Sequence, residues 1–338
     1  MKFCDIMRED KFNTLNIIRV IAMTGIVVDH YFQASGVPIL ANTGLQIGGV
    51  FLMVFFALSA YLFGMKWAKG DYEGFETMNF MKKRCLRIYI PLWLTLPMVV
   101  AAEYLILHSI DLKTILFNIV GLGWAKPFGI GGHLWYITLM MFLYVVFVVF
   151  SRLRLDKYRL TYWLVGYVAL LAVYVLGESY FTTGSSVAPI ITVFLASLLF
   201  FKSGELMNYC RRWVKTVLFV TIFALLLSWW MYVQGWHYTH KAIATFSSFS
   251  AGFCLFVCLM IYIKSTRSYR IISHFADISY EVYLVHLPLI PFTSDMLKMI
   301  GIENNLWWVI IPWLMLTYMF ATGIHKATQR ITVDLNKK

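Results

Sequence analysis

Long apolar runs separated by short polar connections dominate the pattern of this chain. A helix that crosses the hydrocarbon core of a bilayer needs about 20 consecutive, mainly apolar residues. Runs close to that length lie at about 13–34, 46–66, 88–107, 134–150, 160–178, 188–207, 214–234, 242–263, 278–297 and 306–326. The pattern therefore predicts an all-α integral membrane protein with about ten transmembrane helices.

Basic residues gather in every second connection between these runs. They precede the first run and follow the even-numbered runs, at Lys2, Arg8, Lys11, Lys66, Lys69, Lys82, Lys83, Arg84, Arg87, Arg152, Arg154, Lys157, Arg159, Arg211, Arg212, Lys215, Lys264, Arg267, Arg270, Lys326, Arg330, Lys337 and Lys338. The other connections hold only Lys113, Lys126, Lys241 and Lys298. Because Lys and Arg favour the cytoplasmic side, both termini are predicted to be cytoplasmic.

Composition adds little chemistry to this outline. The chain is 60% hydrophobic and 14% charged, and its net charge of +12 comes from topological clusters rather than from a stripe that would bind nucleic acid. The five cysteines have no metal or disulfide spacing, and no nucleotide-binding or serine-hydrolase motif is present. We expect residues 1–338 to form a single transmembrane domain without a metal, in which the glycine-rich connection 108–132 folds back over the helices.

Three ionisable residues interrupt the first apolar run. Arg19 and His30 are 11 positions apart, which places them within about 20° of one face of a helix. Charged groups inside a span are costly and indicate a functional or cavity-lining role. Singly, Arg19 could extend to the cytoplasmic interface and His30 to the outer one, but together they favour a shared cavity. Asp29 could orient the imidazole or simply reach the outer surface.

Arg84 and Arg87 precede the third run on one helical face. Their planar guanidinium groups suit a phosphate, although basic residues at a cytoplasmic helix end also arise from topology alone. Either origin fits the sequence.

Two further groups of polar residues lie in later runs. His133 and Trp135 open the fourth run in HLWYI, where they could reach a substrate or belong to an aromatic belt. Ser279, Tyr283 and His286 share one face of the ninth run. A polar stripe there must face protein or water, either as a catalytic group or as a network of interhelical hydrogen bonds.

The order of these motifs resembles the acyltransferase 3 family of bacterial membrane O-acyltransferases. The resemblance covers nearly the whole chain and depends on Arg19 with His30, FFALSAYLFG at Phe55–Gly64, the Arg84 and Arg87 pair, HLWYI at His133–Ile137 and SYEVYLVH at Ser279–His286. Two positions depart from the family pattern. Ala60 follows Ser59 where glycine is common, and Met140 with Met141 replaces the glutamates of longer members, so the chain resembles the shorter branch that lacks an appended soluble domain.

The resemblance implies an activity and roles for individual residues. An acetyl group would pass from acetyl-CoA, the donor substrate, to a hydroxyl of a cell-surface or lipid-linked glycan at a bacterial plasma (inner) membrane. His30 would be the catalytic histidine and Arg19 its companion, with Arg84 and Arg87 binding the donor. The positions of the other polar residues, and not the resemblance, make them candidate supporting residues: Asp29, His133, Trp135, Ser279, Tyr283 and His286.

Some alternatives stay open at this stage. Intramembrane acids and histidines also build proton relays, so a proton-coupled exporter of a glycan or its precursor is the alternative function. The sequence names neither the glycan nor the acyl group, acetyl or succinyl. It also leaves open whether His30 becomes acylated and which oligomeric state the protein adopts in the bilayer.

Overall fold

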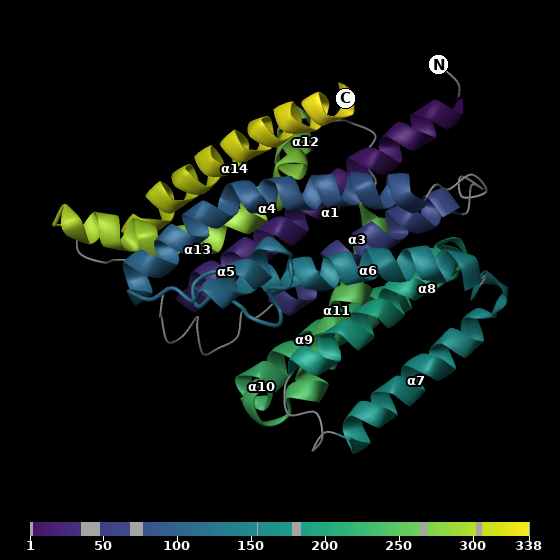
Figure 1. Cartoon of the computed structure of the whole chain (residues 1–338). Coiled ribbons are helices and arrows are strands. Elements are labelled where there is room, and N and C mark those ends of the chain that lie inside the picture. The colour runs from purple at the N-terminus through teal and green to yellow at the C-terminus, as the bar shows by residue number, and fades with distance from the viewer. Residues whose placement is uncertain are drawn as a thin grey trace. The chain divides into compact units, whose positions relative to one another are not determined.

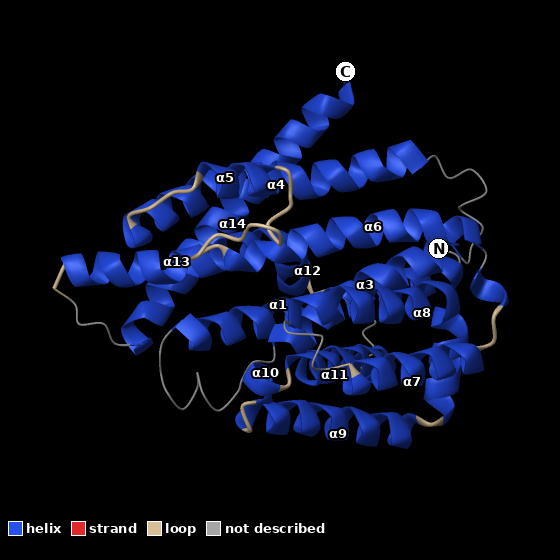
Figure 2. Cartoon of the chain, turned by 60° about the horizontal axis from the view of Figure 1, so that its bottom comes forward, coloured by secondary structure: helices blue, strands red, loops and turns tan. Residues whose placement is uncertain are grey.

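The computed structural model describes residues 3–34, 48–67, 77–153, 155–177, 184–263, 269–301 and 306–337. These residues form helices and connections without a strand (Figure 2). The helices are α1 (Phe3–Ala34), α3 (Gly48–Trp67), α4 (Thr77–Leu107), α5 (Leu112–Ile119), α6 (Trp135–Leu153), α7 (Leu160–Leu176), α8 (Gly184–Arg212), α9 (Val214–Val233), α10 (Trp236–Thr239), α11 (Lys241–Tyr262), α12 (Arg270–Asp277), α13 (Ser279–Met299) and α14 (Leu306–Lys337). The all-α prediction is confirmed for this part of the chain.

The described part of each predicted apolar run is helical. Among the described residues, eight helical segments are long and apolar enough to cross a membrane: Asn13–Ala34, Gly48–Met65, Met81–Leu107, Gly132–Phe150, Val187–Arg212, Val214–Val233, Lys241–Tyr262 and Trp308–Leu335. The other two runs form α7, which is shorter, and α13, which carries Glu281, Asp295 and Lys298. A multi-pass membrane protein is supported, whereas the count of ten spans stays a prediction.

The predicted cytoplasmic position of both termini also stays a prediction. Several of the basic residues on which it depends lie outside the described residues, namely Lys2, Lys69, Arg154, Lys264, Arg267 and Lys338. The same holds for positions 46–47 of the second run and 178 of the fifth.

The chain divides into two compact units. Unit 1 comprises Met1–Phe75 and Val146–Ala276, and unit 2 comprises Glu76–Val145 and Asp277–Lys338. In unit 1, α3 packs against α1, α8 and α11 (Figure 1). Because α3 has neighbours on several sides, residues such as Met53, Phe56 and Ala60 are fully buried.

Small residues allow the helices of unit 1 to approach closely. A Cβ added to Gly252 of α11 would lie 2.2 Å from the carbonyl oxygen of Val50 in α3, and one added to Gly64 would lie 2.5 Å from the carbonyl oxygen of Phe200 in α8. In a bilayer, helices gain little from burying apolar surface against each other, so close van der Waals packing holds them together. These two glycines provide that contact.

In unit 2, α13 packs against α14 and α4, and the short helix α5 packs against α4 (Figure 1). The Tyr280 hydroxyl of α13 donates a hydrogen bond of 3.1 Å to the carbonyl oxygen of Ile88 in α4. Prolines interrupt both helices, at positions 91 and 97 of α4 and at 288 and 291 of α13. Each proline lacks an N–H and leaves a carbonyl four residues earlier without its helical donor.

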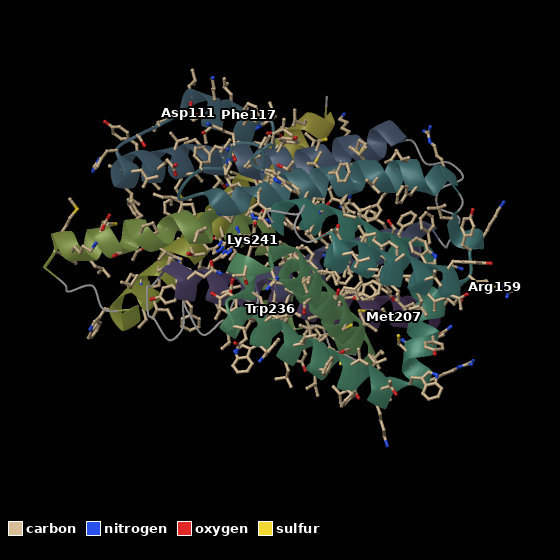
Figure 3. The ribbon with its side chains drawn as sticks, turned by 90° about the horizontal axis from the view of Figure 1, so that it is seen from below. Asp111, Phe117, Arg159, Met207, Trp236 and Lys241 are labelled. Atoms are coloured by element: carbon tan, nitrogen blue, oxygen red, sulfur yellow. The ribbon has the colours of Figure 1, made fainter. Side chains whose placement is uncertain are left out.

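The connection between α4 and α6 folds back along α4, as the glycines of this segment predict. Asp111 (labelled in Figure 3) caps α5 by accepting from the backbone N–H of Lys113, which lowers the pKa of its carboxyl. Lys126 Nζ lies 3.3 Å from Asp111 Oδ2. After α5, the Tyr89 hydroxyl and the Trp93 indole N–H of α4 donate to the carbonyl oxygens of Val120 and Ile119. Side chains of α4 therefore provide hydrogen-bond donors for the backbone carbonyls at the turn that follows α5.

The packing of α11 against α3 generates a first prediction. Gly252→Ala should lower the melting temperature of the purified protein in detergent, with a loss of about 1–3 kcal/mol, because the added methyl meets backbone that cannot move aside. Thermal unfolding followed by size-exclusion chromatography measures this.

Gly204→Ala in α8 is the matched control. A Cβ at Gly204 meets nothing within 4 Å, and alanine is the better helix former by up to about 1 kcal/mol. This variant should be as stable as the parent or more so. Equal losses at both positions would contradict the close-packing argument.

Candidate functional site

The polar residues of the first run lie on the continuous helix α1. The helix runs from Phe3 to Ala34 without a break, so the spacing of Arg19 and His30 places them on one face, as predicted. Both side chains are half-buried, whereas Asp29 is 2% exposed. An arginine and an imidazole, each half-buried on one face of a membrane helix, are suited to proton transfer and to stabilising a developing negative charge.

Asp29 has local partners that account for its burial. The Gln33 amide, one turn later, donates to Asp29 Oδ2 at 2.7 Å. A Cβ added to Gly48, the first residue of α3 that the structure describes, would lie 2.5 Å from the same oxygen. A carboxylate beside the start of a helix is stabilised by the positive end of the helix dipole. These contacts agree with a structural part for Asp29 in unit 1.

Arg84 and Arg87 have different surroundings within unit 2. Arg84 is half-buried, and its guanidinium carbon lies 5.7 Å from the centroid of the Tyr144 ring in α6. Arg87, one turn further along α4, is exposed, as are Lys82 and Lys83. A cation held over an aromatic face is partly fixed in orientation. The first arginine is thus held in place by unit 2, while Arg87 extends from its surface.

Unit 2 brings together His133, Tyr283 and His286. The ring centroids of His133 and His286 are 5.2 Å apart, and the His133 ring is equally close to that of Tyr283. The Tyr283 hydroxyl donates to the backbone carbonyl of His133. His286 is fully buried, and the Trp313 indole N–H of α14 donates to its carbonyl oxygen at 2.8 Å. The two sequence motifs HLWYI and SYEVYLVH therefore meet in one cluster.

Pro288 explains why a histidine is needed in this cluster. Without an N–H, Pro288 cannot bond to the carbonyl of Leu284, four residues earlier in α13. His133 Nε2 lies 3.2 Å from that carbonyl oxygen and supplies a donor. Since lipid offers no hydrogen bonds, such a carbonyl must find its partner inside the protein.

The same contacts assign the protons on both imidazoles. A carbonyl oxygen only accepts, so His133 carries a proton on Nε2 and His286 carries one on Nδ1, which lies 2.7 Å from the carbonyl oxygen of Tyr283. The second nitrogen of each ring can then act as a hydrogen-bond acceptor. This arrangement is an interhelical network of the kind expected from the polar stripe of the ninth run.

The remaining predicted residues lie near this cluster in the chain. Trp135 is half-buried and pairs edge-to-face with Trp124 of the preceding loop, with ring centroids 6.0 Å apart. Ser279 is buried at the start of α13.

Sequence reasoning noted Glu281, as a neighbour of Asp277, but missed its histidine partner and a second buried carboxylate of unit 2. Glu103 of α4 accepts from the backbone N–H groups of Gly129 and Ile130. His325 of α14 donates from Nδ1 to Glu281 Oε1 of α13 at 2.9 Å. Glu103 lies inside the predicted third run. An ionisable residue inside an apolar run indicates a functional or cavity-lining role, so the argument made for Asp29 also applies to Glu103. No local signal in the sequence pairs Glu281 with a histidine 44 residues later.

The geometry supplies imidazoles, arginines and hydroxyls rather than a metal-binding cluster. Among the described residues, no group of three or more His, Cys, Asp and Glu side chains could hold a metal ion. Such a set suits acid–base and acyl-transfer chemistry.

A comparison with known families decides the class. The acyltransferase 3 model, an acyltransferase domain, matches residues 12–324. The chain belongs to the acyltransferase 3 family. This membership confirms the resemblance and supports a membrane acyltransferase, and it gives no support to the exporter alternative. No curated protein and no solved structure matches the chain.

The match to the acyltransferase 3 model includes every site residue predicted from the sequence. Arg19 and His30 lie near its beginning, and the Glu281 and His325 pair falls on either side of its end at position 324. The predicted site residues therefore all belong to the acyltransferase domain.

The contact between His133 and the carbonyl of Leu284 generates a second prediction for this acyltransferase 3 protein. His133→Phe should cost about 1–3 kcal/mol of stability, because the carbonyl loses its donor. In a Pro288→Ala background, residue 288 regains an N–H for that carbonyl, and the cost of His133→Phe should fall by half or more. A double-mutant cycle on thermal unfolding in detergent measures the coupling.

Pro291→Ala is the control background. It restores a donor for the carbonyl of residue 287, which His133 does not contact, so the cost of His133→Phe should stay unchanged. Equal relief from both proline substitutions would mean that helix straightening, and not this hydrogen bond, sets the cost.

Proposed function

We propose that this protein is a membrane-bound O-acyltransferase of the bacterial inner membrane that moves an acetyl or other short acyl group from acetyl-CoA to a hydroxyl of a cell-surface or lipid-linked glycan. The observation that carries the proposal is the placement of Arg19 and His30 on one face of α1 within a chain that belongs to the acyltransferase 3 family. Membership of the acyltransferase 3 family supports acyl-transfer activity in general. The donor, the acceptor and the role of His30 are the proposed part.

The donor is proposed to bind at the cytoplasmic end of α4. The phosphates of CoA are anions, and guanidinium groups form paired, charge-assisted hydrogen bonds with them. Arg84 is held over Tyr144, and Arg87 is exposed beside it. An arginine held over an aromatic ring next to an exposed arginine suits the capture of a flexible phosphorylated arm.

His30 is proposed to handle the proton or the acyl group itself. In the first route, His30 takes the hydroxyl proton while the hydroxyl oxygen attacks the thioester carbonyl. The C–S bond then breaks, and the CoA sulfur leaves with that proton as a thiol. In the second route, the imidazole attacks the thioester carbonyl, the C–S bond breaks and CoA leaves as a thiolate. The hydroxyl oxygen then attacks the acyl carbon, the C–N bond breaks, and the hydroxyl proton passes to the CoA sulfur. Both routes balance and use the same residue.

The tetrahedral intermediate needs a hydrogen-bond donor for its oxyanion. Arg19 shares the face of α1 with His30 and is proposed for this part. The Tyr283 hydroxyl, another donor suggested by its position in the sequence, donates instead to the carbonyl of His133. Using it on substrate would require that bond to break.

A kinetic experiment in lipid nanodiscs tests the proposal. Radiolabelled acetyl-CoA is incubated with an extract of bacterial lipid-linked and cell-surface glycans, and label on glycan is measured for the wild type, His30→Ala and Arg84→Ala. His30→Ala should lower turnover by about 10²- to 10⁴-fold, the usual contribution of an acid–base group. Arg84→Ala should raise KM for acetyl-CoA about tenfold or more, because a charge-assisted bond is lost.

His274→Ala is the matched control, since His274 is an exposed histidine of α12, and it should keep wild-type turnover. Label that stays on the wild-type protein before acceptor is added would select the second route, and succinyl-CoA in parallel compares acyl groups. Full activity of His30→Ala would refute its proposed role, and an inert wild type would refute the donor and acceptor classes.

A further inference from the structure

A buried carboxylate in α4 has no part in the chemistry described so far. Glu103 is 8% exposed and lies within the membrane-crossing segment Met81–Leu107. An ionisable side chain at such a position is costly unless the protein satisfies it. Glu103 is satisfied by backbone rather than by a cation, because Oε1 accepts from the N–H of Gly129 at 2.7 Å and Oε2 from the N–H of Ile130 at 2.8 Å.

Two glycines of the segment GIGG (Gly129–Gly132) permit the contact. A Cβ added to Gly129 would lie 2.7 Å from a Leu107 methyl and 3.1 Å from Glu103 Oε1, and one added to Gly131 would lie 2.6 Å from a methyl of Val99. A larger residue at either position would crowd these side chains of α4. The carboxylate and the glycines of GIGG therefore form one fitted contact, and two charge-assisted hydrogen bonds are its main polar component.

The held segment leads directly into the His133 cluster. Leu134 N donates to the carbonyl of Gly131 at 3.0 Å, so the chain turns immediately after the anchored pair. His133 lies three residues beyond Ile130 and bonds through Nε2 to the carbonyl of Leu284 in α13. Glu103 in α4 thus fixes one end of a short turn whose other end reaches α13.

Among the described residues, further side chains bond to the earlier part of the connection. The Asn118 amide donates to the carbonyl of Lys126, and the Thr138 hydroxyl donates to that of Gly121. These bonds lie upstream of residue 129 and leave the GIGG turn to Glu103. Non-helical backbone beside a membrane helix persists only where protein groups satisfy it, and at this turn Glu103 does so.

We propose that Glu103 is a positioning residue of the acyl-transfer reaction, whose carboxylate holds the GIGG turn and with it His133 at the end of unit 2 that faces the acceptor. The inference rests on the proposed function and on the predicted topology, in which this connection is non-cytoplasmic. Glu103 acts through the loop and touches neither donor nor acceptor. Its loss should therefore affect acceptor use and leave donor binding unchanged.

Amide hydrogen exchange and acyl-transfer kinetics, both measured in nanodiscs, test the positioning role of Glu103. In Glu103→Ala, the Gly129 and Ile130 amides should exchange about ten- to a hundredfold faster, because each loses its acceptor. Label transfer from acetyl-CoA to the glycan extract should fall by a similar factor, with KM for acetyl-CoA within twofold of wild type. Glu103→Asp, which keeps the charge, should regain part of both effects.

Two further variants separate positioning from general destabilisation. Gly129→Ala disturbs the same contact from the loop side. It should reproduce both the faster amide exchange and the slower label transfer, even if Glu103→Ala folds poorly. Thr95→Val is the matched control, because Thr95 is a fully buried polar residue of α4 whose hydroxyl bonds to the carbonyl of Pro91. It should change neither amide exchange at the loop nor acceptor kinetics.

Each outcome has a defined meaning. Fast exchange with unchanged transfer would overturn the positioning role, and unchanged exchange would overturn the contact itself. A wild type that transfers no acyl group would instead remove the proposed function, and with it the catalytic part of the inference. The exchange data would then still report whether Glu103 holds the loop.

Discussion

Unsatisfied backbone groups are the constraint on which the structure of unit 2 depends. Inside a bilayer no water can replace a missing hydrogen bond, so each carbonyl freed by a proline needs a partner from the protein. Pro288 frees the carbonyl of Leu284, and the imidazole of His133 provides the donor. The bond joins the turn immediately before α6 to the second turn of α13, and it fixes which nitrogen of His133 carries the proton.

The buried carboxylates follow the same rule, each with different partners. Glu103 bonds to two backbone N–H groups, Glu281 to His325, and Asp29 to Gln33. Glu103 and Glu281 thereby connect different elements of unit 2, whereas the bond from Gln33 to Asp29 lies within α1. Arg19 and His30 form a contrasting set, because they lie half-buried on one face of α1. Because of this position, the proposed acyl-transfer chemistry is assigned to Arg19 and His30.

Membership of the acyltransferase 3 family connects the helices with a reaction class. The family match defines acyl transfer, and the physical chemistry of the residues narrows how it would proceed. The proposed phosphorylated donor would require cations, which Arg84 and Arg87 can supply, and the proposed hydroxyl acceptor would require a base, which His30 can supply. The hydrogen bonds of His133, Tyr283 and His286 hold helices and loops together in unit 2.

Much of the fold could be predicted from the sequence. Apolar runs of bilayer-crossing length marked the helices, because the length of a span follows from membrane thickness. The helical period also placed Arg19 with His30 on one face. Helix ends were less accurate: α4 begins at Thr77, 11 residues before its predicted run, because exposed polar turns continue a helix beyond the apolar segment.

Tertiary structure decided which polar residues contact each other. The sequence by itself determined the membrane class, the helical segments and the set of candidate residues, since hydropathy and periodicity are local properties. It did not pair Glu103 with Gly129, His133 with Leu284 or Glu281 with His325, because these contacts join residues 26, 151 and 44 positions apart. Partners at such separations follow from how helices pack, and only the folded chain defines that packing.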